Sequence, residues 1–321
     1  MWTMNITILH IRRFFFGTAY GKWISIIGGS CLLFVAYLLI SRAAIYNSDN
    51  ASILLEAQGM QHGNLLLQRW YMPTDSFLTG EIPLYALGLW LGFSMPALLH
   101  IVPALLYTLL VLAGGYLAIT LSQEKQRVWG VLALLGIVAF PALDMAQGLF
   151  VGPLHFSTVL YALLGLILYR RFLSAEKKGR WLAFTIMLLI TVLMILGDPF
   201  ALVLFVVPLL LNESIGIFVK RRITSLETST IVGVLLATLL AFGLRQLLNS
   251  AAGVHILLTA GFSFTTLSGM LGNLQLAIVF LATIFHANLL ANNAFSLSAL
   301  PLYINALVVI VLIYATARWC I

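Results

Sequence analysis

The chain has 321 residues, of which 62% are hydrophobic and only 8% are charged, and its mean hydropathy is +1.06. In a water-soluble globular domain about a quarter of the residues are charged, so this composition excludes that class. Most of the protein surface must therefore face lipid. The formal charge of +7 comes mostly from basic residues in short segments between apolar runs. Membrane topology and anionic lipid explain such segments without nucleic acid.

Long apolar runs divide the chain into expected membrane spans of about 20 residues each. The first run begins near Trp23, after a basic N-terminal segment (residues 1–22), and is expected to be a retained anchor. The expected spans are about 23–40, 96–121, 128–142, 154–169, 181–197, 200–219, 230–248 and 297–317. The sequence therefore predicts an all-α, polytopic membrane helix bundle with about eight spans in a single domain, 1–321.

A ninth apolar stretch, residues 274–290, is long enough to span but has asparagines and a histidine at its margins. Counting it as a span would also move Arg318 to the side that carries few basic residues. We therefore expect residues 249–296 to form an extracytoplasmic loop with a re-entrant or interfacial segment. This gives eight spans, with nine as the alternative.

The charges divide between the two sides of this layout. Of the 17 Lys and Arg residues, all but Arg42, Arg69 and Arg245 fall on one side. Six of the ten acids fall on the other side, namely Asp49, Glu56, Asp75, Glu81, Asp144 and Asp198. Because positively charged loops stay in the cytoplasm, we expect a multi-pass protein of the plasma (inner) membrane with a cytoplasmic N-terminus.

The first extracytoplasmic loop, residues 41–95, is expected to be ordered. Ser48 and Asp49 are residue types that cap helices, apolar residues then recur at helical spacing, and Gly63 suits a left-handed stop. Pro83 opens a second short apolar segment. Helices this short lie flat at headgroup level instead of spanning. Ordering a loop costs about 1–2 kcal/mol of backbone entropy per residue, which indicates that the order serves a function.

Parts of this loop resemble a known family. The runs 47–51, 56–64 and 75–83, together with Trp70, are similar to the first external loop of bacterial GT-C glycosyltransferases, a class that includes protein mannosyltransferases and lipid A aminoarabinose transferases. Residues 152–155 and 197–199 resemble motifs that occur later in the sequences of the same group. The resemblance implies a GT-C-like transmembrane domain. It also implies transfer of a hexosyl or pentosyl group from a polyprenyl-phosphate-linked donor to an acceptor at the extracytoplasmic face.

The acids expected on the outer face are the other candidate site residues, and the resemblance bears on Asp49 and on the place of Asp144. Asp49 matches the family's aspartate, which serves as base, metal ligand or both; its alternative role is an ordinary helix N-cap. Glu81 is the second catalytic candidate. Asp144 follows the third expected span, where related enzymes often carry a further acid for substrate or metal. For Glu81 and Asp144 the alternative is a solvated loop acid. No cofactor is certain, and the cation to be considered is Mg²⁺ or Mn²⁺.

Cationic side chains are expected to bind the donor phosphate. The candidates are His155, Arg245 and Arg69, because positive charge is scarce on the outer side. The arginine guanidinium can bind phosphate through two hydrogen bonds. The alternatives are an interfacial histidine bonded to backbone and arginines that snorkel to lipid headgroups. Asp198 lies in a Gly-Asp-Pro sequence, which favours an ordinary turn over a site residue.

Two other classes of protein stay open. A secondary transporter would carry ionisable residues in the middle of its spans, and these spans carry almost none. A catalytically inactive or truncated relative is the other alternative, because the sequence stops directly after the last expected span, whereas members of the resembled group usually continue. The expected partners are the lipid-linked donor and membrane lipid. The sequence specifies neither the donor sugar nor the acceptor.

Overall fold

The computed structural model describes residues 19–43, 47–73, 75–122, 124, 129–131, 139, 155–251, 253–257 and 266–284, with a few single residues between 303 and 314. This part of the chain is nearly all-α, as the sequence predicts. Its two strands have two residues each.

Six helical segments are long and apolar enough to cross a membrane, so by length and composition the chain is a membrane protein. They are α2 (Ala19–Ser41), α5 (Met95–Leu121), α8 (Phe156–Ser174), α9 (Lys177–Gly197), the π-helix η3 (Leu202–Val206) continued by α10 (Val207–Lys220), and α11 (Ser225–Ala251). Most of the expected spans at 128–142 and 297–317 falls outside the described residues. The total of eight spans therefore stays a prediction.

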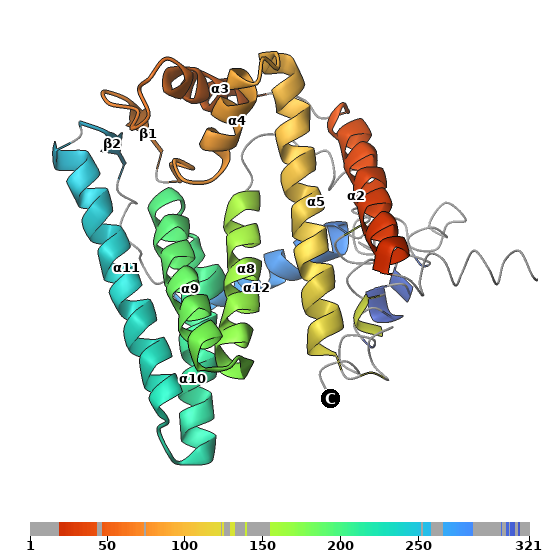
Figure 1. Ribbon diagram of the computed structural model, residues 1–321, viewed down its shortest axis with the longest axis vertical. Coiled ribbons are helices and arrows are strands. Elements are labelled where there is room, and N and C mark those ends of the chain that lie inside the picture. Colours follow the sequence, from red (N-terminus) through yellow and green to blue (C-terminus); the bar gives the residue numbers. More distant parts are fainter. Residues whose placement is uncertain are drawn as a thin grey trace, which may run out of the picture.

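The described spanning helices lie side by side, and α5 and α8 both start near the first loop, whereas α9 and α11 end near it (Figure 1). Helix α2 packs against α5, α5 against α8, α8 against α9, and α9 against α11. The connections from α8 to α9 and from α10 to α11 lie at one end of the bundle. The first loop lies at the other end, together with the C-termini of α9 and α11. We call this second end the loop end.

Two short helices form much of the first loop and pack against each other: α3 (Ser48–Gln61) and α4 (Glu81–Trp90). Helix α3 begins with a capping box in which Asn47 Oδ1 accepts from the Asn50 amide and Asn50 Oδ1 accepts from the Asn47 amide. The cap is therefore Asn47, one residue before the expected Ser48 and Asp49. Beyond α3, Gly63 has φ +94°, the left-handed conformation that its sequence favoured.

A small parallel ladder joins the first loop to the segment after α11. Strand β1 (Tyr71–Met72) pairs with β2 (His255–Ile256), with Tyr71 opposite His255. The Asn249 side chain at the end of α11 donates to the carbonyl of Ile256 and accepts from its amide. The ladder thereby fixes the position of the loop over the end of α11.

Helix α12 (Leu267–Ile284) covers the described part of the expected re-entrant segment. In Figure 1 it runs across the direction of the long helices. The expected segment continues to residue 290, beyond the described residues, so its re-entrant or interfacial character stays a prediction.

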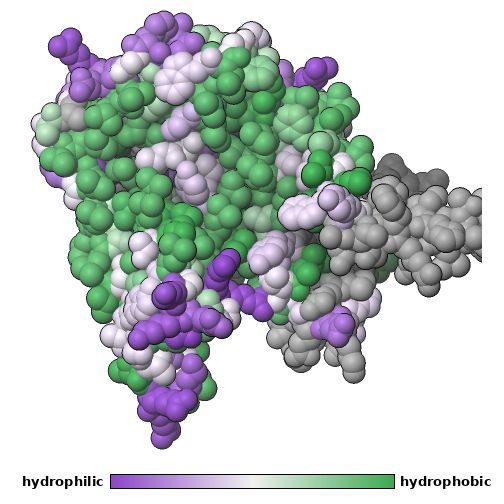
Figure 2. Space-filling view, in the orientation of Figure 1, coloured by the Kyte–Doolittle hydropathy of each residue, from purple (hydrophilic) through white to green (hydrophobic). Residues whose placement is uncertain are grey.

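The surface between the two ends of the bundle is apolar. Leu32 is 74% exposed, Leu239 68% and Ile27 59%. Figure 2 shows a broad hydrophobic band with polar residues gathered above and below it. Apolar side chains exposed to this extent over several helices are typical of a surface that faces lipid. The loop end therefore lies where the apolar band gives way to polar residues.

Candidate functional site

A cavity of about 250 Å³ opens at the loop end. Its walls come from α3, from the segment between β1 and α4, and from the residue that precedes α8. Acidic, hydroxyl and imidazole groups gather there. The lining residues are Asp49, Ser52, Ile53, Glu56, Pro73, Asp75, Ser76, Phe77 and His155.

Helix α3 presents a polar stripe to this cavity. Asp49, Ser52 and Glu56 are separated by three and four residues, a spacing that places side chains on one helix face. Asp49 is exposed, whereas Glu56 is buried with only 5% of its surface exposed. The Ser52 hydroxyl donates to Glu56 Oε1 at 3.2 Å.

His155 stands at the start of α8 in a left-handed conformation, φ +56°. Its ring nitrogen Nδ1 lies 2.5 Å from Asp198 Oδ2. The Thr158 hydroxyl donates to the same carboxylate oxygen, and the Phe200 amide donates to Oδ1 at 2.9 Å. Asp198 is 2% exposed. The Gly-Asp-Pro turn therefore holds a buried carboxylate that fixes the histidine at the cavity wall.

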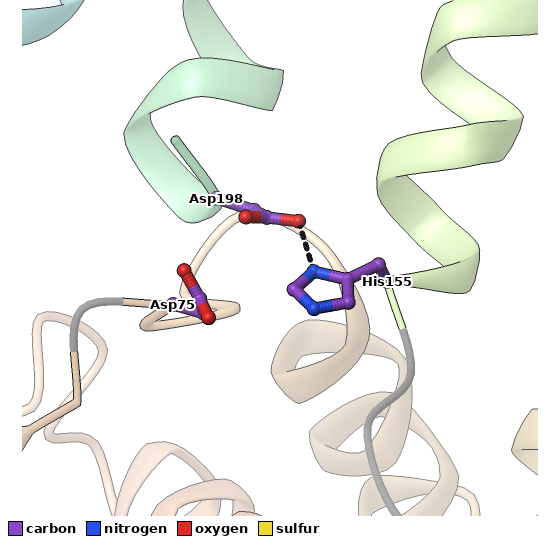
Figure 3. A group of neighbouring side chains, drawn as sticks. All are labelled: Asp75, His155 and Asp198. Atoms are coloured by element: carbon purple, nitrogen blue, oxygen red, sulfur yellow. Dashed lines mark hydrogen bonds and ion pairs between the residues drawn. The ribbon is translucent and has the colours of Figure 1, made fainter. Parts of the chain in front are cut away.

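Asp75 is the third member of this group. The Phe77 amide donates to the Gly197 carbonyl at 2.8 Å, which brings the loop against the end of α9. As a result, one ligand atom from each of Asp75, His155 and Asp198 lies within 4.8 Å of the others (Figure 3). The three come from segments far apart in the sequence, so only the tertiary structure brings them together.

Hydrogen bonds shift the ionisation of the histidine–aspartate pair. The hydrogen bond to Asp198 raises the pKa of His155 above its ordinary value, although burial opposes this. Burial works against ionisation of Asp198, yet the bonds from His155 and Thr158 hold the pKa of that carboxyl below its usual value. Both shifts favour a charged pair.

The pKa of Asp75 shifts in the opposite direction to that of Asp198. Burial raises the pKa of Asp75, and the nearby Asp198 carboxylate raises it further. The positive charges of His155 and Arg245 act in the opposite direction. Arg245 on α11 is thus close enough to influence this cluster. It is 4% exposed and donates from Nη2 to the Leu257 carbonyl at 3.2 Å.

An imidazole and two carboxylates can hold a divalent cation. This mixture of nitrogen and oxygen ligands suits Mn²⁺ or Zn²⁺ better than Mg²⁺, which prefers oxygen ligands. A cation bound through Nδ1 of His155 and Oδ2 of Asp198 would have to replace the proton that those two atoms share. The predicted metal ligand Asp49 lines the same cavity but is not one of the three residues. Asp144 lies outside the described residues.

Glu81 is buried at the start of α4, where it contacts the start of α8. It is 3% exposed, and it accepts hydrogen bonds from the Ser157 amide at 3.0 Å and the Ser157 hydroxyl at 2.6 Å. Burial raises the pKa of Glu81, and the bonds from Ser157 oppose the rise. Because Ser157 lies in the first turn of α8, Glu81 supplies acceptors to that helix terminus. It is therefore not a solvated loop acid, and its contacts fix the helix that follows His155.

Arg69 is exposed and has φ +68°. Its amide donates to the Gly253 carbonyl at 2.8 Å, next to the β1–β2 ladder. Arg69 is not one of the described residues that line the cavity. The structure thus brings Asp49 and His155 to one cavity, places Arg245 where its charge acts on Asp75, and leaves Arg69 at the surface.

Three residues of the site were missed or ranked low by sequence reasoning. Glu56 shares the α3 stripe with Asp49, and its helical spacing from Asp49 was a usable signal. Asp75 carried no comparable signal, and Asp198 looked like an ordinary turn residue.

No family model, curated protein or solved structure matches the chain. The geometry of the loop end and the sequence pattern are therefore the two indications of a function.

Proposed function

We propose that the chain is a membrane glycosyltransferase that moves a sugar from a polyprenyl-phosphate-linked donor to a hydroxyl acceptor. The observation that carries this proposal is the polar cavity at the loop end, lined by Asp49, Glu56, Asp75 and His155. A lipid-linked donor keeps its chain in the bilayer and its sugar phosphate at headgroup level, which is the level of this cavity. The resemblance of residues 47–83 to GT-C enzymes supports the same activity.

We infer that the loop end faces the extracytoplasmic side of the plasma membrane. The support is the set of basic residues at the opposite end of the bundle, namely Arg170, Arg171, Lys177, Lys178, Arg180, Lys220, Arg221 and Arg222. Loops rich in Lys and Arg stay in the cytoplasm. In this orientation α2 enters the membrane from the cytoplasm, and α3 and α4 lie at the outer headgroup level.

The chemistry of glycosyl transfer matches the groups in the cavity. The acceptor oxygen attacks the anomeric carbon and must lose its proton to a base. The departing phosphate gains negative charge and needs a positive partner. Asp49 supplies a carboxylate at an exposed position of the cavity. The raised pKa of His155 favours its protonated form, which can meet the phosphate.

A divalent cation would fit this proposal but is not required by it. Asp75, His155 and Asp198 would hold the cation, and when bound it would neutralise charge on the donor phosphate. Without it, the protonated imidazole of His155 is the positive group among the described residues that line the cavity. Transfer measured after chelation, with Mn²⁺ then restored, separates the two cases.

The test is transfer of labelled sugar in membranes that contain the protein. Polyprenyl-phosphate sugars are supplied as donors, and the unmodified protein is compared with Asp49→Asn and with Glu176→Gln. Glu176 is an exposed acid at the opposite end of the bundle, so it serves as the control. We expect Asp49→Asn to slow transfer by about 100-fold or more, because the acceptor is then no longer held in place, and Glu176→Gln to leave transfer unchanged.

Equal rates for Asp49→Asn and the unmodified protein would remove Asp49 from the site. No transfer by the unmodified protein with any donor would contradict the proposal and favour an inactive relative. Solute uptake by proteoliposomes in the absence of transfer would instead favour a transporter.

A further inference from the structure

We propose that Glu56 is the catalytic base that takes the proton from the acceptor hydroxyl. This inference rests on the proposed function and deepens it. It assigns the proton transfer to a buried carboxyl in the wall of the cavity, and it leaves Asp49 to orient the acceptor where the cavity is exposed.

Helix α3 carries two acidic side chains toward the cavity. Asp49 and Glu56 are seven residues apart on one face, so their Cα atoms are separated by about 10 Å along the helix axis. Both side chains line the cavity. One of them is exposed and the other is 95% removed from solvent. An acceptor that enters past Asp49 therefore reaches Glu56 in the more buried part.

The Glu56 carboxyl is held by a hydrogen bond and has other titratable groups around it. The Ser52 hydroxyl, one turn earlier on α3, donates to Oε1 and holds the carboxyl in place. The other titratable groups that line the cavity are Asp49 from α3, Asp75 from the loop and His155 from the start of α8. Helix α4, which packs against α3, contributes Glu81, whose carboxylate is bonded to Ser157.

The ionisation of Glu56 suits proton transfer near neutral pH. Burial raises the pKa of Glu56 to about 7, and the hydrogen bond from Ser52 opposes the rise. A base works best when its pKa lies near the working pH, because the ionised form is then both populated and basic. Buried carboxyls with such values in a cavity are typical of functional sites.

Transfer forms one bond to the anomeric carbon and breaks another. A lone pair of the acceptor oxygen forms the bond to the anomeric carbon while the hydroxyl proton passes to the Glu56 carboxylate. The bond between the anomeric carbon and the donor's phosphate oxygen breaks, and its electron pair stays on the phosphate. The products are the glycosylated acceptor, polyprenyl phosphate and a protonated Glu56, which returns its proton to water before the next turnover.

The experiment is a pH profile of kcat/KM for transfer, measured with the unmodified full chain, Glu56→Gln, Ser52→Ala and Glu176→Gln. We expect the unmodified rate to rise with pH through an apparent pKa of about 7. Glu56→Gln should lose about 100-fold or more in rate, together with this rising limb. Ser52→Ala should shift the limb to higher pH, because the bond that favours the ionised carboxyl is gone. Glu176→Gln should match the unmodified profile.

A rising limb that survives in Glu56→Gln, at a rate close to that of the unmodified protein, would overturn the inference and leave the proposed function intact. Absence of transfer by the unmodified protein would overturn both. If Glu56→Gln fails to fold, the Ser52→Ala profile decides: an unmoved limb contradicts the role of Glu56.

Discussion

His155 adopts a left-handed conformation that a residue with a side chain adopts at a cost of about 1–2 kcal/mol. Its bond to the buried Asp198 offsets that cost and sets the ring at the cavity wall. Asp198 is in turn held by the Thr158 hydroxyl and the Phe200 amide. At the scale of single residues, the site therefore depends on a carboxylate that does not itself line the cavity.

The first prediction concerns the charge of His155. Replacing Asp198 with Asn removes the carboxylate that raises the pKa of His155, so this pKa should fall toward or below the ordinary histidine value. Chemical shifts of ¹³C-labelled histidine, followed against pH in detergent micelles, give the pKa directly. Glu176→Gln serves as the control. An unchanged pKa in Asp198→Asn would show that the ion pair does not form.

The same pair predicts a pH dependence of stability. The folded-state pKa of His155 is raised, so its contribution is complete below the unfolded value of about 6.5 and is lost as pH rises through the folded value. The contribution of Asp198, whose pKa is lowered, is lost as pH falls through its folded value. The difference in melting temperature between the unmodified protein and Asp198→Asn should therefore be largest at about pH 5–6 and shrink at alkaline pH. A difference that grows with pH would contradict this sign.

Sequence reasoning at this scale identified the residues whose signals are local. Asp49 follows a capping sequence, and the structure places it at the cavity. Asp75 and Asp198 meet because the loop pairs with the end of α9 through Phe77 and Gly197, a contact 120 residues apart in the chain. A contact between segments so far apart cannot be predicted from residue spacing in a single sequence.

At the scale of elements, the start of α4 and the start of α8 are locked together at Gly80. A Cβ atom at this position would lie 2.2 Å from the Ser157 hydroxyl oxygen, which is bonded to Glu81. Close approach of the two helix termini therefore requires glycine here. The junction also fixes the direction in which α8 leaves His155.

The third prediction is that Gly80→Ala destabilises the protein by about 1–3 kcal/mol through this overlap. Thermal or denaturant unfolding in detergent measures the change. Gly28→Ala in α2 is the matched control, because a Cβ there meets nothing within 4 Å. Equal stability of the two variants would mean that the α4–α8 junction yields without cost.

Elements were predictable to different degrees. The spanning helices α2, α5, α8, α9, α10 and α11 follow from long apolar runs, because a lipid-facing helix must be apolar over its whole length. The ladder between β1 and β2 could not be foreseen. Strands of two residues show no alternation, and their partners are nearly 200 residues apart.

At the scale of the whole molecule, most of the described basic residues lie at one end of the bundle and the acids of the site lie at the other. Asp49, Glu56, Asp75 and Asp198 lie at the loop end, while the basic connections between α8 and α9 and between α10 and α11 lie at the other end. The apolar band shown in Figure 2 lies between them. This separation places the cavity on the side opposite to the basic loops.

The fourth prediction tests this orientation. Single cysteines replace the exposed residues Gln68 at the loop end and Glu176 at the other end, after Cys31 and Cys320 are changed to alanine. In right-side-out membrane vesicles, a membrane-impermeant maleimide should label Gln68→Cys at once. It should label Glu176→Cys only after permeabilisation. The reverse pattern would place the cavity in the cytoplasm.

Photolabelling can locate the lipid-linked donor on the protein. A polyprenyl-phosphate sugar with a photoreactive group on the sugar is added to the full chain in lipid nanodiscs, illuminated, and the labelled peptides are identified by mass spectrometry. We expect label in the peptides that contain the cavity-lining residues Asp49, Ser52, Glu56, Asp75, Phe77 and His155, and loss of label when unlabelled donor competes. Label confined to α2 or to the turn between α10 and α11, unaffected by competitor, would contradict this expectation.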